Sequence, residues 1–261
     1  MEQLHFRFTT KLKLDSEVKN HYFTLKCIPK SNVRQRIESC NITITPDADI
    51  FYNTDSFGNI TVSGSIIPPH SSFEFTVEGS AAAGLDVFEE LEDDEIKCAY
   101  YKYHTGYTRP GKYLEEYFKS LDLTQCKSTY DKVTAIMHAI NRDLVYEKKI
   151  TDISTSAEQA MSIGKGVCQD YAHIMLALCR MSGIAVRYTV GIMKGEGESH
   201  AWVEALCKNR WYGFDPTNNL LVDGNYIKIS SGRDYSDCII NKGQFIGNAS
   251  QHTIVAASVT D

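Results

Sequence analysis

Residues 164–173 read GKGVCQDYAH and run directly into the apolar stretch 174–179, IMLALC. The glycines allow turn conformations that other residues resist, and the apolar run predicts a buried helix that starts near Cys168. A helix N-terminus carries a partial positive charge, which favours a thiolate over a thiol. The stretch therefore predicts a loop that delivers a nucleophilic thiol to the first turn of a central helix. The alternative is that Cys168 packs as a small apolar side chain, as many free cysteines do.

Two predicted strands follow, at 199–206 and 211–217, joined by the short polar segment 207–210. If the turn has an even number of residues, the two ends of this segment pair, and His200 lies diagonally across from Asp215. Such diagonal neighbours are roughly 7–8 Å apart, which two side chains can bridge. A carboxylate there can accept the imidazole N–H, fix its tautomer and stabilise an imidazolium beside a thiolate. The hairpin therefore predicts that His200 and Asp215 act as a pair.

Three motifs carry a resemblance to a known family: GVCQDYAH at 166–173, HAWVE at 200–204 and FDPT at 214–217. In this order and spacing they resemble the transglutaminase-like superfamily of papain-type folds, in its bacterial branch of cysteine proteases with an N-terminal β domain. The resemblance implies a catalytic triad on Cys168, His200 and Asp215. It also implies a peptide or protein substrate.

Length and composition are those of a soluble globular protein, with 261 residues of which 43% are hydrophobic and 23% charged. The net charge of −6 argues against nucleic acid or an anionic membrane as a partner, because both require basic patches. The first residues lack the pattern of a secretory signal, and no stretch is long enough to span a membrane. The eight cysteines are scattered, so we expect reduced thiols and a cytoplasmic protein.

Two domains are expected. Residues 1–84 contain several short runs in which apolar and polar side chains alternate, which predicts an all-β domain arranged as an antiparallel sandwich. Small residues at 79–84 mark the boundary, and 85–261 form the transglutaminase-like catalytic domain. The acidic run 89–95 after the boundary is expected to be a solvated face or a linker.

Helices are expected to lead to the thiol loop. Apolar residues at 3, 4, 7 and 11 positions after Val133 predict an amphipathic helix that extends to Leu144. Residues 155–158 have the form of a capping box, which predicts a short helix that ends at Gly164. A central helix against an antiparallel sheet is an α+β arrangement, and we expect this fold class.

No metal or other cofactor is predicted. A zinc site would have to draw on Cys168, His173, His200 and Cys207, but no pair of them has the short spacing of a zinc motif. His173 lies five positions after Cys168, and such residues do not share a helical face, so we expect it to pack or hydrogen-bond and not to act as the base. The glycine-containing segment 195–197 is either a flap over the cleft or a connection.

The predicted function is a cysteine-dependent acyl-transfer enzyme, a peptidase or amidase in which His200 takes the thiol proton and Cys168 attacks an amide carbonyl. The backbone N–H of Cys168 would hold the oxyanion with a second donor, for which Gln169 and Tyr146 are candidates. Water or an amine can resolve the acyl-enzyme, so a true protein-glutamine transglutaminase stays open. A non-catalytic protein-binding module is the alternative from another class, and for it we would expect a replaced triad position.

Overall fold

The structure is a computed structural model that describes residues 2–90 and 99–261. The helices in these residues are α2 (Lys112–Ser120), α3 (Thr129–Asp143), α4 (Ala157–Ile163), α5 (Cys168–Met181) and the 3₁₀ helix η1 (Tyr235–Asp237). The strands are β1 (Glu2–Ile28), β2 (Gln35–Thr45), β3 (Ile50–Thr54), β4 (Ile60–Ile66), β5 (His70–Ala83), β6 (Phe88–Glu90), β7 (Val145–Tyr146), β8 (Lys165–Gly166), β9 (Val186–Met193), β10 (Gly195–Gly197), β11 (His200–Cys207), β12 (Arg210–Asp215), β13 (Leu220–Leu221), β14 (Tyr226–Gly232), β15 (Asn241–Ile246) and β16 (Gln251–Thr260). Among the described residues, no helix has the length and apolar character needed to cross a membrane.

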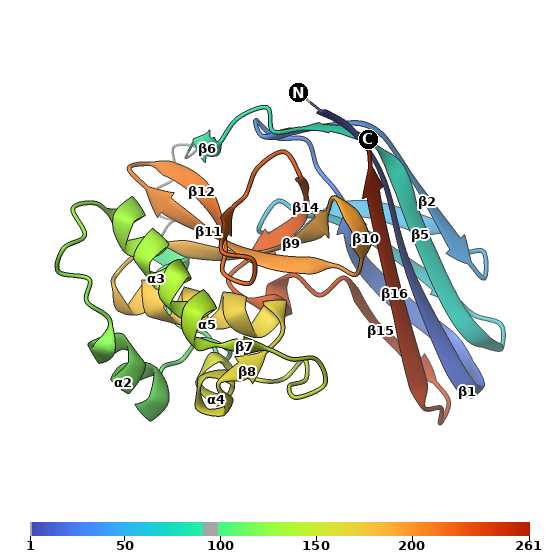
Figure 1. Cartoon of the computed structure of the whole chain (residues 1–261). Coiled ribbons are helices and arrows are strands. Elements are labelled where there is room, and N and C mark those ends of the chain that lie inside the picture. The colour runs from blue at the N-terminus through green and yellow to red at the C-terminus, as the bar shows by residue number, and fades with distance from the viewer. Residues whose placement is uncertain (1, 91–98) are drawn as a thin grey trace.

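The long strand β1 is shared by the two layers of the N-terminal sandwich (Figure 1). Its first half pairs with β5 and β16, and its second half pairs with β4 and β15. Apolar side chains of both halves, such as Phe6 and Phe23, lie in one hydrophobic core together with Phe75 of β5. The alternation of apolar and polar residues therefore predicted this part of the fold correctly.

The last strands of the chain belong to the first sheet. β15 and β16 both pair with β1, and β16 runs beside β1 so that the two ends of the chain lie close together in Figure 1. The expected division at residue 84 into 1–84 and 85–261 does not include this return. Pairing between the two ends of a chain depends on contacts that no local pattern encodes.

The second sheet carries the helices on one face (Figure 1). Its strand order is β13-β12-β11-β9-β14, with β6 added along β12. Ala201, Val203 and Ala205 of β11 share a core with the buried residues of α5, so this face of the sheet packs on the central helix. The predicted α+β class, with a central helix against an antiparallel sheet, is confirmed.

The hairpin of β11 and β12 has the register predicted from the sequence. Cys207 pairs with Arg210, which leaves Lys208 and Asn209 as the turn. Both turn residues have positive φ, 50° and 61°. Two positive φ angles are the requirement of a type I′ turn, the kind that suits a two-residue hairpin, although glycine is more common at the second position.

The helices before the thiol loop differ from the prediction in one detail. α3 begins after a capping box and ends near the expected residue, and Gly164 ends α4 in the left-handed conformation at φ 72°. The predicted box at 155–158 is wrong by one residue, because Ser156 is the N-cap of α4 and pairs with Gln159. Glu158 instead accepts three backbone N–H groups at the start of α2, from Gly111, Tyr113 and Leu114.

Candidate active site

The buried carboxylate of Asp170 fixes the backbone of the thiol loop by hydrogen bonds. Cys168 is the first residue of α5 and is partly exposed, and Asp170 one half-turn later is buried. Oδ2 of Asp170 accepts the backbone N–H of Val167 at 2.8 Å and the hydroxyl of Thr151 at 2.6 Å. A Cβ at Gly166 would lie 2.5 Å from the same oxygen, so this close approach requires glycine. The GVCQD sequence thus fixes where the thiol emerges.

His200 brings the three predicted residues together. It is the first residue of β11, and its Nε2 lies 2.8 Å from Oδ2 of Asp215. The thiol of Cys168 lies near the same imidazole and helps to raise its pKa. Because Asp215 occupies Nε2, Nδ1 is the ring nitrogen left for the thiol. The order is therefore thiol, imidazole, carboxylate.

Asp215 is completely buried and receives five hydrogen bonds. Oδ2 accepts from His200, from the side-chain amide of Asn218 at 2.8 Å and from the hydroxyl of Tyr226 at 2.9 Å. Oδ1 accepts the backbone N–H groups of Thr217 at 3.0 Å and Asn218 at 3.2 Å. Burial alone raises the pKa of this carboxyl, but the hydrogen bonds and the charge of His200 outweigh it and hold the pKa below its usual range. Asp215 is thus an ionised acceptor.

The environment of His200 favours the imidazolium. Burial lowers its pKa, but the hydrogen bonds with Asp215 and Cys168 and their charges act in the opposite direction and raise the pKa to about 9. An ordinary histidine has a pKa of about 6.5, so a free imidazole would be mostly neutral at pH 7. The arrangement can therefore store a proton on His200 and stabilise a thiolate on Cys168 near neutral pH.

The turn that carries Asp215 is fastened to helix α3. Nδ2 of Asn141 donates to the backbone carbonyls of Pro216 at 3.1 Å and Thr217 at 2.8 Å. Sequence reasoning missed Asn141, Asn218 and Tyr226. An Asn three positions after an Asp is a signal for a side-chain-capped turn and could have indicated Asn218. Asn141 reaches the site from a helix 75 positions before Pro216, and Tyr226 reaches it from a strand that is separated from β12 by two others in the sheet.

His173 is a packing residue, as expected from its position on the helix. It is fully buried between the rings of Tyr107 and Tyr188, with centroid distances of 4.8 and 5.1 Å. Its Nε2 accepts the backbone N–H of Tyr235 at 3.2 Å. Burial lowers its pKa to about 3. A neutral, enclosed imidazole of this kind has no access to the thiol chemistry.

The two candidates for a second oxyanion donor differ in their surroundings. The side-chain amide of Gln169 donates to the carbonyl of Ile153 at 3.2 Å, so it is already engaged. Tyr146 lies on β7, which pairs with β8 directly before the thiol loop, and its side chain is half exposed. Burial raises the pKa of Tyr146, and the charge of Cys168 raises it further.

An exposed ion pair joins Lys148 to Glu198, close to His200 in the sequence. Nζ of Lys148 lies 3.1 Å from Oε1 of Glu198, two residues before His200, and both side chains are exposed. The neighbouring segment β10 (Gly195–Gly197) hydrogen-bonds with β16. The segment was expected to be either a flap over the cleft or a connection. Because it is a paired strand, it fits a connection.

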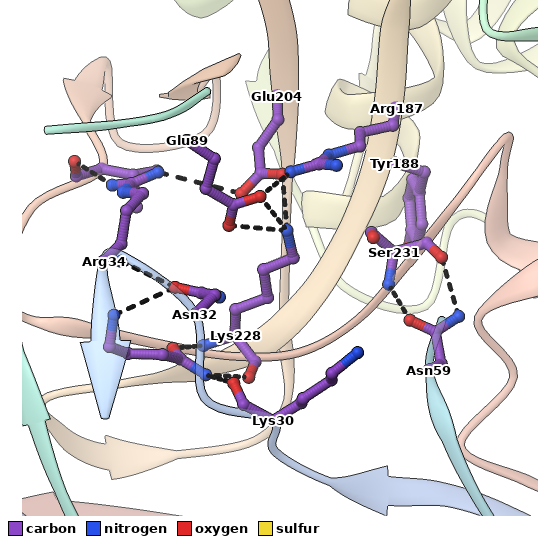
Figure 2. Close-up of polar contacts among 12 residues, drawn as sticks. Lys30, Asn32, Arg34, Asn59, Glu89, Arg187, Tyr188, Glu204, Lys228 and Ser231 are labelled. Carbon is purple, nitrogen blue, oxygen red and sulfur yellow. Dashed lines mark hydrogen bonds and ion pairs between the residues drawn. The ribbon is translucent and has the colours of Figure 1, made fainter. Parts of the chain in front are cut away.

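A network of ion pairs surrounds Glu204 of β11 (Figure 2). Glu204 accepts from Nε of Arg187 at 2.5 Å and from Nζ of Lys228 at 2.8 Å, and Nη1 of Arg34 lies 3.8 Å away. Glu89 bonds to the same Lys228 at 3.1 Å and to Arg187. The cations hold the pKa of both carboxyls below their usual range although burial opposes this.

The network corrects the interpretation of the acidic run 89–95. Glu89 is not part of a solvated face, because β6 pairs with β12 and places this carboxylate among buried cations. Glu90 also belongs to β6, and the other acidic residues of the run, at 92–95, lie outside the described residues. A run of like charges contains no local signal that its first member has partners more than 90 positions away.

Comparisons with known proteins bear on the family and the fold. Residues 120–216 match the Transglutaminase-like superfamily, and residues 4–82 match the Bacterial transglutaminase-like N-terminal region. Uncharacterized proteins of Mycobacterium leprae and Mycobacterium tuberculosis are 26% and 27% identical over 89% and 88% of this chain, and over 89% and 83% of their own lengths. A crystal structure titled "Putative Cysteine Protease", from Cytophaga hutchinsonii, has the same fold, with a TM-score of 0.79 and 22% identity over 100% of this chain and 92% of that one.

Proposed function

This chain belongs to the transglutaminase-like superfamily, and we propose that it is a cysteine-dependent acyl-transfer enzyme that hydrolyses peptide or side-chain amide bonds. One observation carries the proposal. The imidazole of His200 is hydrogen-bonded to a buried carboxylate, and its pKa is raised both by that group and by Cys168, the thiol at the start of the central helix. Family membership alone would not justify it, since one fold hosts many functions.

The proposed first step is acylation. The thiolate of Cys168 adds to the carbonyl carbon of the amide, and the carbonyl oxygen becomes an oxyanion. When the C–N bond breaks, the imidazolium of His200 gives its proton to the leaving amine, and a thioester on Cys168 results. Asp215 stabilises the imidazolium before transfer and holds the ring in place afterwards.

The proposed oxyanion site uses two donors. The backbone N–H of Cys168 belongs to the first turn of α5, where no earlier carbonyl of the helix is available to it. The hydroxyl of Tyr146 is the second donor that the surroundings support, because the amide of Gln169 is bonded to Ile153. Donors aimed at the developing charge typically contribute 10²–10³-fold to the rate.

The second step is deacylation. Neutral His200 takes a proton from water, the hydroxide equivalent adds to the thioester carbonyl, and the thiolate leaves as the carboxylic acid forms. We propose water as the acceptor, with a polypeptide as substrate and the cytoplasm as location. Amine transfer, as in a protein-glutamine transglutaminase, and partner binding without catalysis are the competing outcomes.

The test incubates a complex mixture of peptides with the protein and a primary amine probe, monodansylcadaverine, and maps products by mass spectrometry. Cys168→Ala is the matched control. The proposal expects new peptide termini or deamidated side chains that depend on Cys168. Incorporation of the amine instead of water would make the protein a transferase, and products identical to those of the control would contradict an enzymatic function.

A further inference from the structure

Tyr226, from the strand at one edge of the second sheet, donates a hydrogen bond to the triad carboxylate of Asp215. We propose that Tyr226 is a positioning residue, whose hydroxyl holds Asp215 in the orientation that His200 requires. The inference rests on the proposed function of Cys168, His200 and Asp215. Its observation is independent, because Tyr226 lies in none of the three sequence motifs.

The contact spans several strands. Tyr226 is the first residue of β14 and Asp215 the last of β12, and β9 and β11 lie between these strands in the sheet. The Tyr226 hydroxyl is nevertheless 2.9 Å from Asp215 Oδ2, the same oxygen that accepts from His200 at 2.8 Å. Donors from two separate strands thus meet on one carboxylate oxygen, and they restrict the rotation of the carboxylate more than a single donor would.

The intervening strand is shaped to allow this contact. A Cβ at Gly191 of β9 would lie 2.5 Å from Cη2 of Trp202, so the missing side chain makes room for the indole. Trp202 is fully buried, and the ring of Tyr226 packs against it edge-on at 5.4 Å and 73°. Tyr226 is itself only 4% exposed. Packing alone therefore fixes the ring of Tyr226, so forming the hydrogen bond to Asp215 costs little additional conformational entropy.

The carboxylate of Asp215 needs donors from the protein because it is buried away from solvent. Asp215 is fully buried, and burial raises its pKa, but hydrogen bonds from His200, Asn218 and Tyr226 and the charge of His200 outweigh this effect and lower it. The other charged group acting on Tyr226 is Asp223, in the turn before β14. Loss of the Tyr226 hydroxyl should therefore raise the pKa of Asp215 and loosen its alignment with His200. The thiolate–imidazolium pair would then persist over a narrower range at low pH.

The test is Tyr226→Phe, read by the pH dependence of iodoacetamide alkylation at Cys168, located by peptide mass mapping. We expect alkylation at pH 6 to be about tenfold slower than in the wild type, and the acid limb of the profile to move to higher pH by about one pH unit. The matched control is Tyr117→Phe, which removes a 2.8 Å hydrogen bond from a tyrosine to Asp143 on the helices and should leave the profile unchanged.

A second comparison separates positioning from a structural role. In an Asp215→Asn background, Tyr226→Phe should cause no further loss of alkylation rate, because its effect passes through the carboxylate. If Tyr226→Phe does not fold, 3,5-difluorotyrosine at position 226 keeps the ring and strengthens the donor, and the acid limb should then move to lower pH.

The outcomes distinguish the two proposals. A reactive wild-type Cys168 whose profile is unchanged by Tyr226→Phe, or by the fluorinated residue, would overturn the role of Tyr226 and leave the proposed function intact. Equal slowing by Tyr226→Phe with and without Asp215 would also overturn it. A wild-type Cys168 no more reactive than the other thiols would contradict the proposed function itself.

Discussion

Nε2 of His200 lies 2.8 Å from Oδ2 of Asp215, on a hairpin whose two-residue turn lies at its far end. The distance is a consequence of register, because pairing of Cys207 with Arg210 sets every pair along the two strands. A one-residue slip would turn one of the two side chains to the opposite face of the sheet. The turn at Lys208 and Asn209, several residues away, thus determines the distance between His200 and Asp215.

Replacing the carboxylate should change the titration of the imidazole. In Asp215→Asn, the group that does most to raise the pKa of His200 loses its charge, so the pKa should fall from about 9 towards the ordinary value of 6.5. NMR titration of the His200 ring measures this directly. Asp143→Asn, which removes a carboxylate on α3 away from the site, is the control. An unchanged titration of His200 would contradict the assigned pairing.

The same pKa predicts a pH dependence of stability. The folded-state pKa of His200, about 9, lies above the unfolded value of 6.5, so its contribution is fully present below pH 6.5 and is lost as pH rises to 9. The loss should be about 3 kcal/mol of unfolding free energy, an order-of-magnitude figure for this largely buried ring. Urea unfolding of the wild type and of His200→Gln from pH 6 to 9.5 tests it. If the unfolding free energies of the two proteins change with pH in parallel, His200 does not make this contribution.

The anchor of the Asp215 turn should matter for both stability and reactivity. Asn141→Ala leaves the carbonyls of Pro216 and Thr217 without their side-chain donor and should cost about 1–2 kcal/mol of unfolding free energy. Alkylation of Cys168 should also slow, because Asp215 moves with the turn. His138→Ala removes an exposed contact of the same helix and should change stability by less than about 0.5 kcal/mol. Equal effects of the two variants would show that Asn141 is not a specific anchor.

The buried ion network should be sensitive to loss of one member. Lys228→Met leaves Glu89 and Glu204 buried with less positive charge, and the expected loss of unfolding free energy is about 3–5 kcal/mol. The control is Arg7→Met, whose partner Glu78 is exposed, as is Arg7 itself. That change should cost less than about 1 kcal/mol. Chemical denaturation compares them, and a Lys228→Met protein as stable as the control would show that the network is dispensable.

The sequence predicted the parts of the site that depend on local rules. Glycines and an apolar run located Cys168 at a helix start, and strand pairing across a short turn located His200 and Asp215 on one face. These inferences needed only helix and strand periodicity. The motif resemblance supplied the order of the triad.

Apart from Asn218, the parts that sequence reasoning missed depend on contacts between separate elements of the fold. Tyr226 reaches Asp215 across two strands, and Glu89 meets cations from β9 and β14. The C-terminal strand β16 returns to β1 over a separation of more than 200 residues. Each of these residues has an ordinary local pattern, so its partner becomes visible only once the sheet has formed.

The most direct test of the central claim is the pH dependence of iodoacetamide alkylation at Cys168 in the wild type and in His200→Ala. We predict that wild-type Cys168 reacts well below the reference thiol pKa of about 8.5 and that the substitution abolishes this advantage. Such a result would establish a thiolate–imidazolium pair. If Cys168 reacts no faster than the other cysteines, or equally fast without the imidazole, the proposed acyl-transfer chemistry is contradicted.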